Sequence, residues 1–212
     1  MDPKKAYYEK RGRKLTEVLK RRHFDAVYCE SREEALKEAL HQISKEDVVA
    51  WGGALTCHQI GLMDALEDQG YRTINREKAA TPEERTQCLR DGLLSDVFLT
   101  GANAISMTGE MVNIDGTGNR VAAIVYGPRK VLVVAGMNKV VDSLPDAMNR
   151  ARTIAAPMNQ QRFEDCSTAC HTSGKCGDCL GEGCICNQIL ITRNCRPAGR
   201  ISFILIGDDL GF

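Results

Sequence analysis

The run Lys130-Val-Leu-Val-Val-Ala-Gly-Met-Asn-Lys139 places five consecutive apolar residues before a glycine. A short unbroken apolar run is typical of a strand that is buried on both faces, as the strands of parallel sheets are. The runs 47–51, 96–100 and 201–206 have the same character, and glycine follows 47–51 and 96–100. Because such runs alternate with helical patterns, we predict an α/β fold in which helices cover both faces of a mostly parallel sheet.

Helix signals lie between these strands. Ser31 with Glu34 and Thr81 with Glu84 have the spacing of capping boxes, in which side chains satisfy the free N–H groups at a helix start. The pattern predicts helices at 31–43, 55–68, 81–94 and 143–155, further strands at 26–29, 71–74 and 110–114, and a turn at 115–119 followed by the segment 120–126.

The length and composition suit a single domain. The domain spans residues 1–212, and 43% of its residues are hydrophobic, which is enough to build a core. Residues 1–23 carry nine Lys or Arg against three acidic residues, and they predict a basic N-terminal helix. Residues 166–195 are a cysteine-rich segment, which we interpret as an insertion before the last strand.

Charge and hydropathy argue against several classes of partner. Lys+Arg and Asp+Glu both number 28, which disfavours nucleic-acid binding by the protein as a whole. The N-terminus lacks the apolar core of a secretory signal, and no apolar run approaches the roughly 18 residues of a membrane-spanning helix. We expect a soluble, cytoplasmic protein with no nucleic-acid or membrane partner, and a homo-oligomer is left open.

Glycine-bearing turns follow four of the predicted strands. In a parallel sheet such turns gather at one edge, where ligands bind, and their backbone N–H groups suit an anion. Arg120 and Lys139 add two cations, while Asp115 adds a carboxylate that could instead cap its own turn. The sequence therefore predicts a site for a small anionic metabolite or a phosphate. The candidate residues are Gly52, Gly53, Thr56, Gly101, Asn103, Asn113, Gly116, Thr117, Gly118, Asn119, Arg120, Gly136, Asn138 and Lys139.

Several nucleotide-binding and catalytic motifs are missing from the sequence. The stretch from Gly116 has Val121 where a dinucleotide-binding fingerprint needs its third glycine. There is no G-x-x-x-x-G-K-[ST] loop and no G-x-S-x-G elbow. We therefore do not expect NAD binding, a P-loop ATPase or a serine hydrolase of the elbow type.

Seven of the 10 cysteines fall within residues 166–195. In a reducing cytosol, clustered thiols more often hold metal than form disulfides. Cys176 and Cys179 form a C-x-x-C pair, whose two thiolates can bind one metal centre. Structural zinc commonly uses two such pairs, whereas a [4Fe–4S] cluster tolerates uneven spacing. The segment favours a [4Fe–4S] cluster, with zinc, or with free thiols or disulfides, as the alternatives.

The chain resembles the LUD-domain family, the lactate utilization proteins. The similarity lies in 51–56, 96–104, 109–120, 130–139 and 199–212, and it is most specific at Asp115–Arg120. The resemblance implies an α/β fold like that of the sugar-phosphate isomerase and CoA-transferase group. It also implies a role in oxidising L-lactate to pyruvate, alongside iron–sulfur redox proteins as partners.

A C-terminal motif of the family's single-domain branch is similar to residues 168–179 followed by Cys186. The resemblance therefore implies Cys170, Cys176, Cys179 and Cys186 as the metal ligands. Cys184 stands where such a motif often has a basic residue, so it is the rival for the fourth position. We expect Cys166 and Cys195, which lie outside the glycine-rich turns, to pack as small apolar residues.

Three functions remain open at this point. The first is a redox-associated protein of L-lactate or related 2-hydroxy acid oxidation, with a metabolite at the loops and a cluster that is structural or carries electrons. The second is a transferase or isomerase acting on an activated acid or a sugar phosphate, in which Asp115 is the candidate base and Arg120 and Lys139 hold the anion. The third is a non-catalytic scaffold or sensor with a structural metal.

Overall fold

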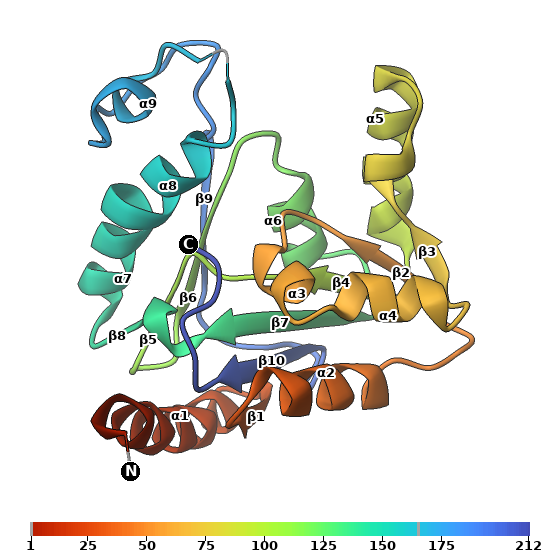
Figure 1. The fold of residues 1–212 in the computed structure, drawn as a ribbon, viewed down its shortest axis with the longest axis vertical. Helices are drawn as coiled ribbons and strands as arrows, with labels where there is room; N and C mark the ends of the chain where they lie inside the picture. Colours follow the sequence, from red (N-terminus) through yellow and green to blue (C-terminus); the bar gives the residue numbers. More distant parts are fainter. Residues whose placement is uncertain (1, 165) are drawn as a thin grey trace.

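A six-stranded sheet, parallel throughout, forms the centre of the molecule (Figure 1). The computed structural model describes residues 2–164 and 166–212 of the chain. In sheet order the strands are β1 (Asp25–Cys29), β10 (Ile201–Ile206), β7 (Lys130–Gly136), β4 (Val97–Thr100), β2 (Val48–Trp51) and β3 (Arg72–Ile74). The predicted α/β class is therefore confirmed.

Strand β7 lies in the middle of this sheet, between β10 and β4. Leu132 and Val134 pack into the core on one face of the sheet, whereas Val131, Val133 and Ala135 pack into the core on the other. All five side chains are fully buried. The unbroken apolar run follows from this position, because each face of the strand needs apolar side chains.

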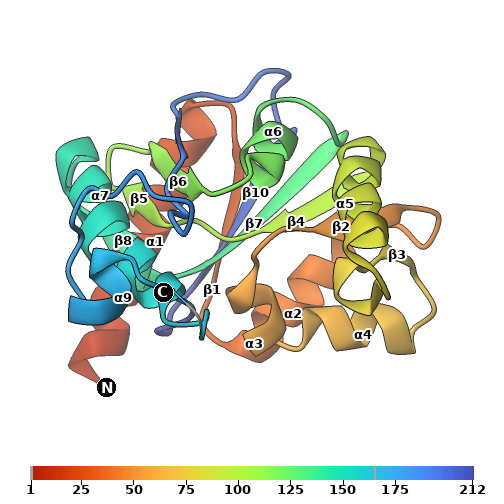
Figure 2. The same cartoon turned by 90° about the horizontal axis from the view of Figure 1, so that it is seen from above.

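Helices cover both faces of the sheet, as Figure 2 shows from above. The first face is covered by α2 (Arg32–His41), α3 (Leu55–Gln59) and α4 (Leu62–Asp68). The second is covered by α1 (Pro3–Arg21), α6 (Asn119–Val125) and a smaller sheet. The remaining helices are α5 (Pro82–Asp91), α7 (Leu144–Arg150), α8 (Ala156–Gln160) and α9 (Ala169–Ser173), with a π-helical turn at Ala151–Ala155 between α7 and α8.

The two predicted helix starts carry their side-chain caps. The Ser31 hydroxyl accepts a hydrogen bond from the Glu34 backbone N–H at 3.2 Å, and the Thr81 hydroxyl does the same for Glu84 at 3.1 Å. Both carboxylates reach back to the backbone N–H groups just before the cap. No helix in the described part of the chain is both long enough and apolar enough to cross a membrane.

A second, mixed sheet was not expected from the sequence. It contains β8 (Val140–Val141), β5 (Ala104–Ser106), β6 (Met111–Asp115) and β9 (Gln188–Thr192), in that order. The predicted strand at 110–114 is thus correct as a strand, but it pairs antiparallel to β5 and β9 outside the main sheet. Since β9 lies within 166–195, the end of the cysteine-rich segment is built into this second sheet.

Two other predictions differ from the structure in local detail. The helix predicted at 55–68 is two helices, because Gly61 between them has a φ of +73°, which a continuing helix does not allow. The segment after the turn at 115–119 is helix α6, whose apolar residues Val121, Ala123 and Ile124 are buried. A short apolar run has the same composition in a buried helix as in a buried strand.

Two glycines form a slot for the ring of Tyr28, where α1 packs against β1. A Cβ at Gly12 would lie 2.2 Å from Tyr28 Cδ2, and a Cβ at Gly207 would lie 2.3 Å from its hydroxyl oxygen. The ring therefore cannot move away from one glycine without meeting backbone at the other. The close approach of α1 to the sheet depends on both glycines.

We predict that Gly12→Ala lowers the free energy of unfolding by about 1–3 kcal/mol, because the added methyl group overpacks the slot. Alanine is the better helix former by up to about 1 kcal/mol, so a gain in stability would be expected if the slot did not matter. Thermal denaturation measures the change. Lys10→Ala, on the exposed side of α1, is the control and should be nearly neutral.

The Gly12→Ala substitution should lose its cost in a Tyr28→Leu background, since the ring is then gone. Equal melting temperatures for Gly12→Ala and the wild type would contradict this packing argument.

Candidate functional site

A cavity of about 500 Å³ lies at the carboxyl ends of β4 and β6, beside α6. Figure 1 shows α5 and the group formed by α7, α8 and α9 on opposite sides of α6, and residues from both sides line the cavity. The lining residues are Gly53, Leu55, Arg76, Arg85, Leu89, Gly101, Ala102, Asn103, Ile114, Asp115, Gly116, Thr117, Asn119, Arg120, Lys139, Asn159, Arg162, Phe163, Glu182, Cys184, Ile185, Asn187 and Phe212.

All four predicted turns contribute to this cavity. The predicted residues that line it are Gly53, Gly101, Asn103, Asp115, Gly116, Thr117, Asn119, Arg120 and Lys139. The turn that contains Asp115 follows β6 of the second sheet, not a strand of the parallel sheet. The expectation that one parallel sheet gathers all four turns is therefore wrong, and the two sheets meet at the site instead.

The other predicted residues lie behind the cavity wall. The Asn113 amide donates to the Gly101 carbonyl at 3.0 Å, and Asn138 Oδ1 accepts from the Leu210 backbone N–H at 3.1 Å. Thr56 is fully buried beneath the wall. Gly52, Gly118 and Gly136 allow close packing, since a Cβ at Gly136 would lie 2.6 Å from the Asp208 carbonyl oxygen. These residues support the site and do not face it.

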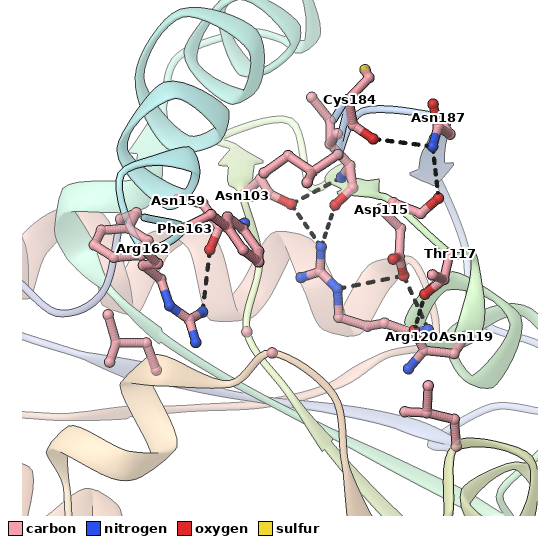
Figure 3. A pocket seen from close by; sticks show the side chains of 18 of the residues that line it. Asn103, Asp115, Thr117, Asn119, Arg120, Asn159, Arg162, Phe163, Cys184 and Asn187 are labelled. Atoms are coloured by element: carbon pink, nitrogen blue, oxygen red, sulfur yellow. Dashed lines mark hydrogen bonds and ion pairs between the residues drawn. The ribbon is translucent and has the colours of Figure 1, made fainter. Parts of the chain in front are cut away.

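Arg120 joins the pieces of the cavity wall, as Figure 3 shows. Its Nη2 donates to Asn103 Oδ1 at 3.1 Å and to the Ile114 carbonyl. Its Nε lies 3.9 Å from Asp115 Oδ2. Burial lowers the pKa of Arg120, while Asp115 opposes that shift and the neighbouring Arg76 adds to it. Arg120 is therefore a structural cation as well as a candidate ligand-binding residue.

Asp115 holds the start of α6. Its Oδ2 accepts hydrogen bonds from the backbone N–H groups of Arg120 at 3.0 Å and Val121 at 3.1 Å. These are free N–H groups of a helix N-terminus, which a carboxylate stabilises. The capping role left open by the sequence is thus present, and it weighs against Asp115 as a general base.

Lys139 is the most unusual charged group of the site. It follows β7, lines the cavity, and is 4% exposed. Its Nζ donates a hydrogen bond to Thr56 Oγ1 at 3.2 Å. No ion pair that involves Lys139 is found among the described residues. Burial lowers the pKa of Lys139 to about 7, and the guanidiniums of Arg150 and Arg120 contribute in the same direction. A large fraction of this amine is therefore neutral near neutral pH.

The cavity has an excess of positive charge that the sequence did not reveal. Among the described residues, its lining carries four arginines, Arg76, Arg85, Arg120 and Arg162, and the partly protonated amine of Lys139, against the two carboxylates of Asp115 and Glu182. Arg76 Nε is buried and has no hydrogen-bond partner among the described residues. Burial lowers the pKa of Arg76, and Arg85 lowers it further. An anion in the cavity would relieve both the repulsion and the missing hydrogen bond.

Three arginines of this set were missed by sequence reasoning. Arg76 and Arg85 come from the region around α5, and Arg162 follows α8, where its Nη1 donates to Asn159 Oδ1 at 3.2 Å (Figure 3). Each belongs to a charged, polar stretch that is typical of a solvated surface. Only the packing of distant elements brings them together.

The cysteine-rich segment forms one wall of the cavity. Asn187 Nδ2 donates to the Gly116 carbonyl at 2.9 Å, and Ile185 packs against Gly116. Glu182, Cys184 and Ile185 line the cavity directly. The segment and the four predicted turns therefore line the same cavity and do not form two separate sites.

Five thiols of this segment lie near one another. Burial raises the pKa of the Cys186 thiol to about 12, and the thiols of Cys184, Cys170, Cys176 and Cys179 add to this effect. The pKa of Cys179 is also raised by burial and then by a hydrogen bond with Cys184. Cys186 packs against the apolar cluster around Ile114, whereas Cys184 contacts Cys179. Cys184 thus joins the four predicted ligands.

The described side chains do not form a site for a single metal ion. No group of three or more Cys, His, Asp or Glu side chains within 2–164 and 166–212 is close enough to hold one metal ion. A four-iron cluster is itself several ångströms across, so its cysteine ligands stand farther apart than those of one zinc ion. Five neighbouring thiols in glycine-rich turns are compatible with that larger group.

The remaining two cysteines of the segment behave differently from each other. Cys195 is 3% exposed within the apolar core, as expected for a small apolar residue. Cys166 is half-buried among polar groups, and its Sγ accepts a hydrogen bond from Gln160 Nε2 at 2.7 Å. The expectation of apolar packing is therefore confirmed for Cys195 and wrong for Cys166.

The chain was compared with known families, curated proteins and solved structures. The model of the LUD domain family matches residues 12–206. A crystal structure of a DUF162 family protein from Deinococcus radiodurans is similar with a TM-score of 0.54 and 11% identity, over 94% of this chain and 97% of that one. Ribose 5-phosphate isomerase A from Neisseria gonorrhoeae matches with a TM-score of 0.34 and 16% identity, over 53% of this chain and 54% of that one. No curated protein matches the sequence.

We predict that Lys139→Met raises the free energy of unfolding at neutral pH by about 1–3 kcal/mol, because it removes an amine that is costly to bury. The unfolded chain keeps this amine protonated up to about pH 10, whereas the folded chain releases the proton above about pH 7. The unfolded state therefore binds more protons across this window, and wild-type stability rises with pH there. The advantage of Lys139→Met should shrink toward pH ~10.

Urea denaturation at several pH values across the window measures this difference. Lys10→Met, at an exposed lysine of α1, is the control and should show no such trend. A stability difference between Lys139→Met and the wild type that is independent of pH would argue that the buried amine keeps its ordinary pKa.

Proposed function

The chain belongs to the LUD domain family, and we propose that it binds a small carboxylate-bearing metabolite in the cationic cavity and takes part in oxidising L-lactate or a related 2-hydroxy acid. The family is lactate-utilization-like, which gives the substrate class. The observation that carries the proposal is the excess of positive charge in the cavity, whose described lining has four arginines and Lys139 against two carboxylates.

The geometry supports binding of a carboxylate more specifically than of any cation. Arg76 offers a buried, unpartnered Nε, and Lys139 offers a buried amine with one hydroxyl partner among the described residues. Charged hydrogen bonds to a carboxylate contribute about 1.5–3 kcal/mol each when they satisfy buried donors. Backbone of the turns at Gly53 and Gly101 lies at the same cavity, where the missing side chains leave room for a ligand.

We further propose that Cys170, Cys176, Cys179 and one of Cys184 or Cys186 hold a [4Fe–4S] cluster beside this cavity. Such a cluster exchanges single electrons when it is bound. The contact between Cys179 and Cys184 supports Cys184 as the fourth ligand, in place of the Cys186 that the family motif nominates. Iron–sulfur redox proteins would be the partners, because oxidation of a 2-hydroxy acid to a 2-oxo acid releases two electrons.

A transferase or isomerase acting on a sugar phosphate is the second candidate. Arg76, Arg85 and Arg162 all line the cavity and lie close enough for their charges to interact, and three guanidiniums suit a phosphate. The hydrogen bonds that occupy Asp115 Oδ2 weigh against the base that this function requires. We therefore rank it below the first.

We predict that L-lactate or pyruvate raises the melting temperature, by several degrees at saturating concentration, since a ligand at ~100 times its Kd stabilises by about 2.7 kcal/mol. Arg76→Gln should weaken binding by roughly tenfold or more through the lost charged hydrogen bond. Arg90→Gln, an exposed arginine of α5 outside the cavity, should leave binding unchanged.

A sugar phosphate is the second arm of this measurement. A shift with the sugar phosphate alone would favour the isomerase or transferase function. The absence of a shift with every anion would leave the scaffold hypothesis and remove the proposed metabolite site.

We predict that anaerobically purified protein contains iron and absorbs visible light in the broad manner of thiolate-ligated clusters. Cys184→Ala should lower the iron content more than Cys186→Ala, and Cys88→Ala, which lies on α5, should leave it unchanged. Metal analysis and absorption spectra measure this. Iron loss confined to Cys186→Ala would restore the family motif, and stoichiometric zinc without iron would exclude the cluster.

A further inference from the structure

We propose that Lys139 is a carbonyl-reactive amine that forms a Schiff base with a 2-oxo acid bound in the cationic cavity. The proposal rests on the anion binding proposed above and names the form of metabolite that the site would hold. It also gives a chemical role to a buried residue that has no carboxylate partner in the part of the chain that the structure describes.

The surroundings of Nζ leave the amine accessible from the cavity. Lys139 lines the cavity although its side chain is almost fully enclosed. A Cβ at Gly211 would lie 2.6 Å from Nζ, and one at Gly101 would lie 3.6 Å from it. Because both positions are glycine, the space beside the amine is not filled by side chains. Thr56 Oγ1, at 3.2 Å, orients Nζ without holding it as an ammonium ion.

The charged and titratable groups that act on Lys139 come from three helices. Arg150 on α7 and Arg120 on α6 are cations and disfavour a third positive charge, while Cys57 on α3 is a buried thiol. Burial raises the pKa of Cys57 to about 12, so this thiol stays protonated and supplies no counter-charge near neutral pH. Desolvation and neighbouring cations are the two conditions that turn a lysine into a nucleophile.

Arg120 favours a 2-oxo acid over other carbonyl compounds. It is the neighbouring guanidinium that also lines the cavity, and its burial leaves it short of water. In a 2-oxo acid the carboxylate is attached directly to the carbonyl carbon. A carbonyl carbon at Nζ therefore keeps the carboxylate close to an amine on which the charge of Arg120 acts, whereas the phosphate of a keto sugar phosphate would reach farther from Nζ.

The chemical step is balanced without an oxidant or a reductant. The neutral amine adds to the carbonyl carbon, forming the C–N bond, and one N–H proton passes to the former carbonyl oxygen. That oxygen then takes up one further proton and leaves as water. This proton balances the one that the ammonium form lost before the attack. The net change is an ammonium and a ketone giving a protonated imine and water.

Reductive trapping tests the proposal on the full-length protein. Pyruvate with sodium cyanoborohydride should convert the imine to a stable secondary amine, and peptide mapping by mass spectrometry should locate the added group on Lys139. Lys139→Arg should remove the adduct. Lys130, a half-buried lysine at the start of β7 whose Nζ donates to the Gln42 carbonyl outside the cavity, should stay unmodified, and Lys130→Arg should trap as the wild type does. The trapping rate should rise with pH to a plateau above about pH 7.

The outcomes separate this proposal from the proposed function. A pyruvate-induced thermal shift with no adduct at Lys139 would overturn the Schiff base and leave anion binding standing. The lack of both a shift and an adduct would overturn both. An adduct with dihydroxyacetone phosphate but not with pyruvate would overturn the assignment of a 2-oxo acid. The map of wild-type peptides decides among these even where Lys139→Arg fails to fold.

Discussion

The arrangement of the site depends on the interactions of the Arg120 guanidinium. It binds the Asn103 side chain and the Ile114 carbonyl, and it faces Asp115, so one buried cation connects the turn after β4, the end of β6 and the start of α6. Its side chain also packs against Gly52 after β2. Removing the guanidinium would leave the buried oxygens of Asn103 and Ile114 without this hydrogen-bond donor. Leaving buried polar atoms unsatisfied costs more free energy than the hydrogen bonds themselves contribute to stability. Arg120 therefore connects the main sheet to the second sheet at the cavity.

Positive charge at the site is a cost that the fold retains. Lys139 is desolvated without a carboxylate beside it among the described residues, and it lies near Arg150 and Arg120. Arg76 is desolvated near Arg85 and Arg162, and the charges of Glu77 and Asp115 do not outweigh these effects. A protein selected for stability alone would place apolar or paired groups at such positions. Buried charges that lie near like charges are characteristic of functional sites, because a ligand of opposite charge lowers their electrostatic cost. The same physical argument therefore supports both the proposed anion binding and the proposed reactivity of the buried amine.

The neighbouring thiols and the cavity are built partly from the same segment of chain, so a change in one is expected to affect the other. Residues 182–187 carry Cys184 and Cys186 and line the cavity, and the Asn187 amide bonds to Gly116 in the turn before α6. A metal centre that orders this segment would also shape the cavity wall. Conversely, a ligand in the cavity would contact chain that belongs to the thiol group.

The sequence by itself determined the elements that depend on neighbouring residues. The unbroken apolar run of β7, the caps at Ser31 and Thr81, and the glycine turns that end the strands are local patterns, and each was predicted where it occurs. The positions of Arg120 and Lys139 at one cavity were predictable for the same reason, since both residues lie in those turns.

The tertiary structure alone decided the second sheet, the arginines of the cavity and the position of Cys184. β9 pairs with β6 across more than 70 residues of chain, and Arg76 and Arg162 approach the cavity from opposite sides. A charged residue on a polar surface helix has the same sequence pattern whether it faces solvent or a distant wall. Long-range packing chooses between these, and no local pattern records that choice.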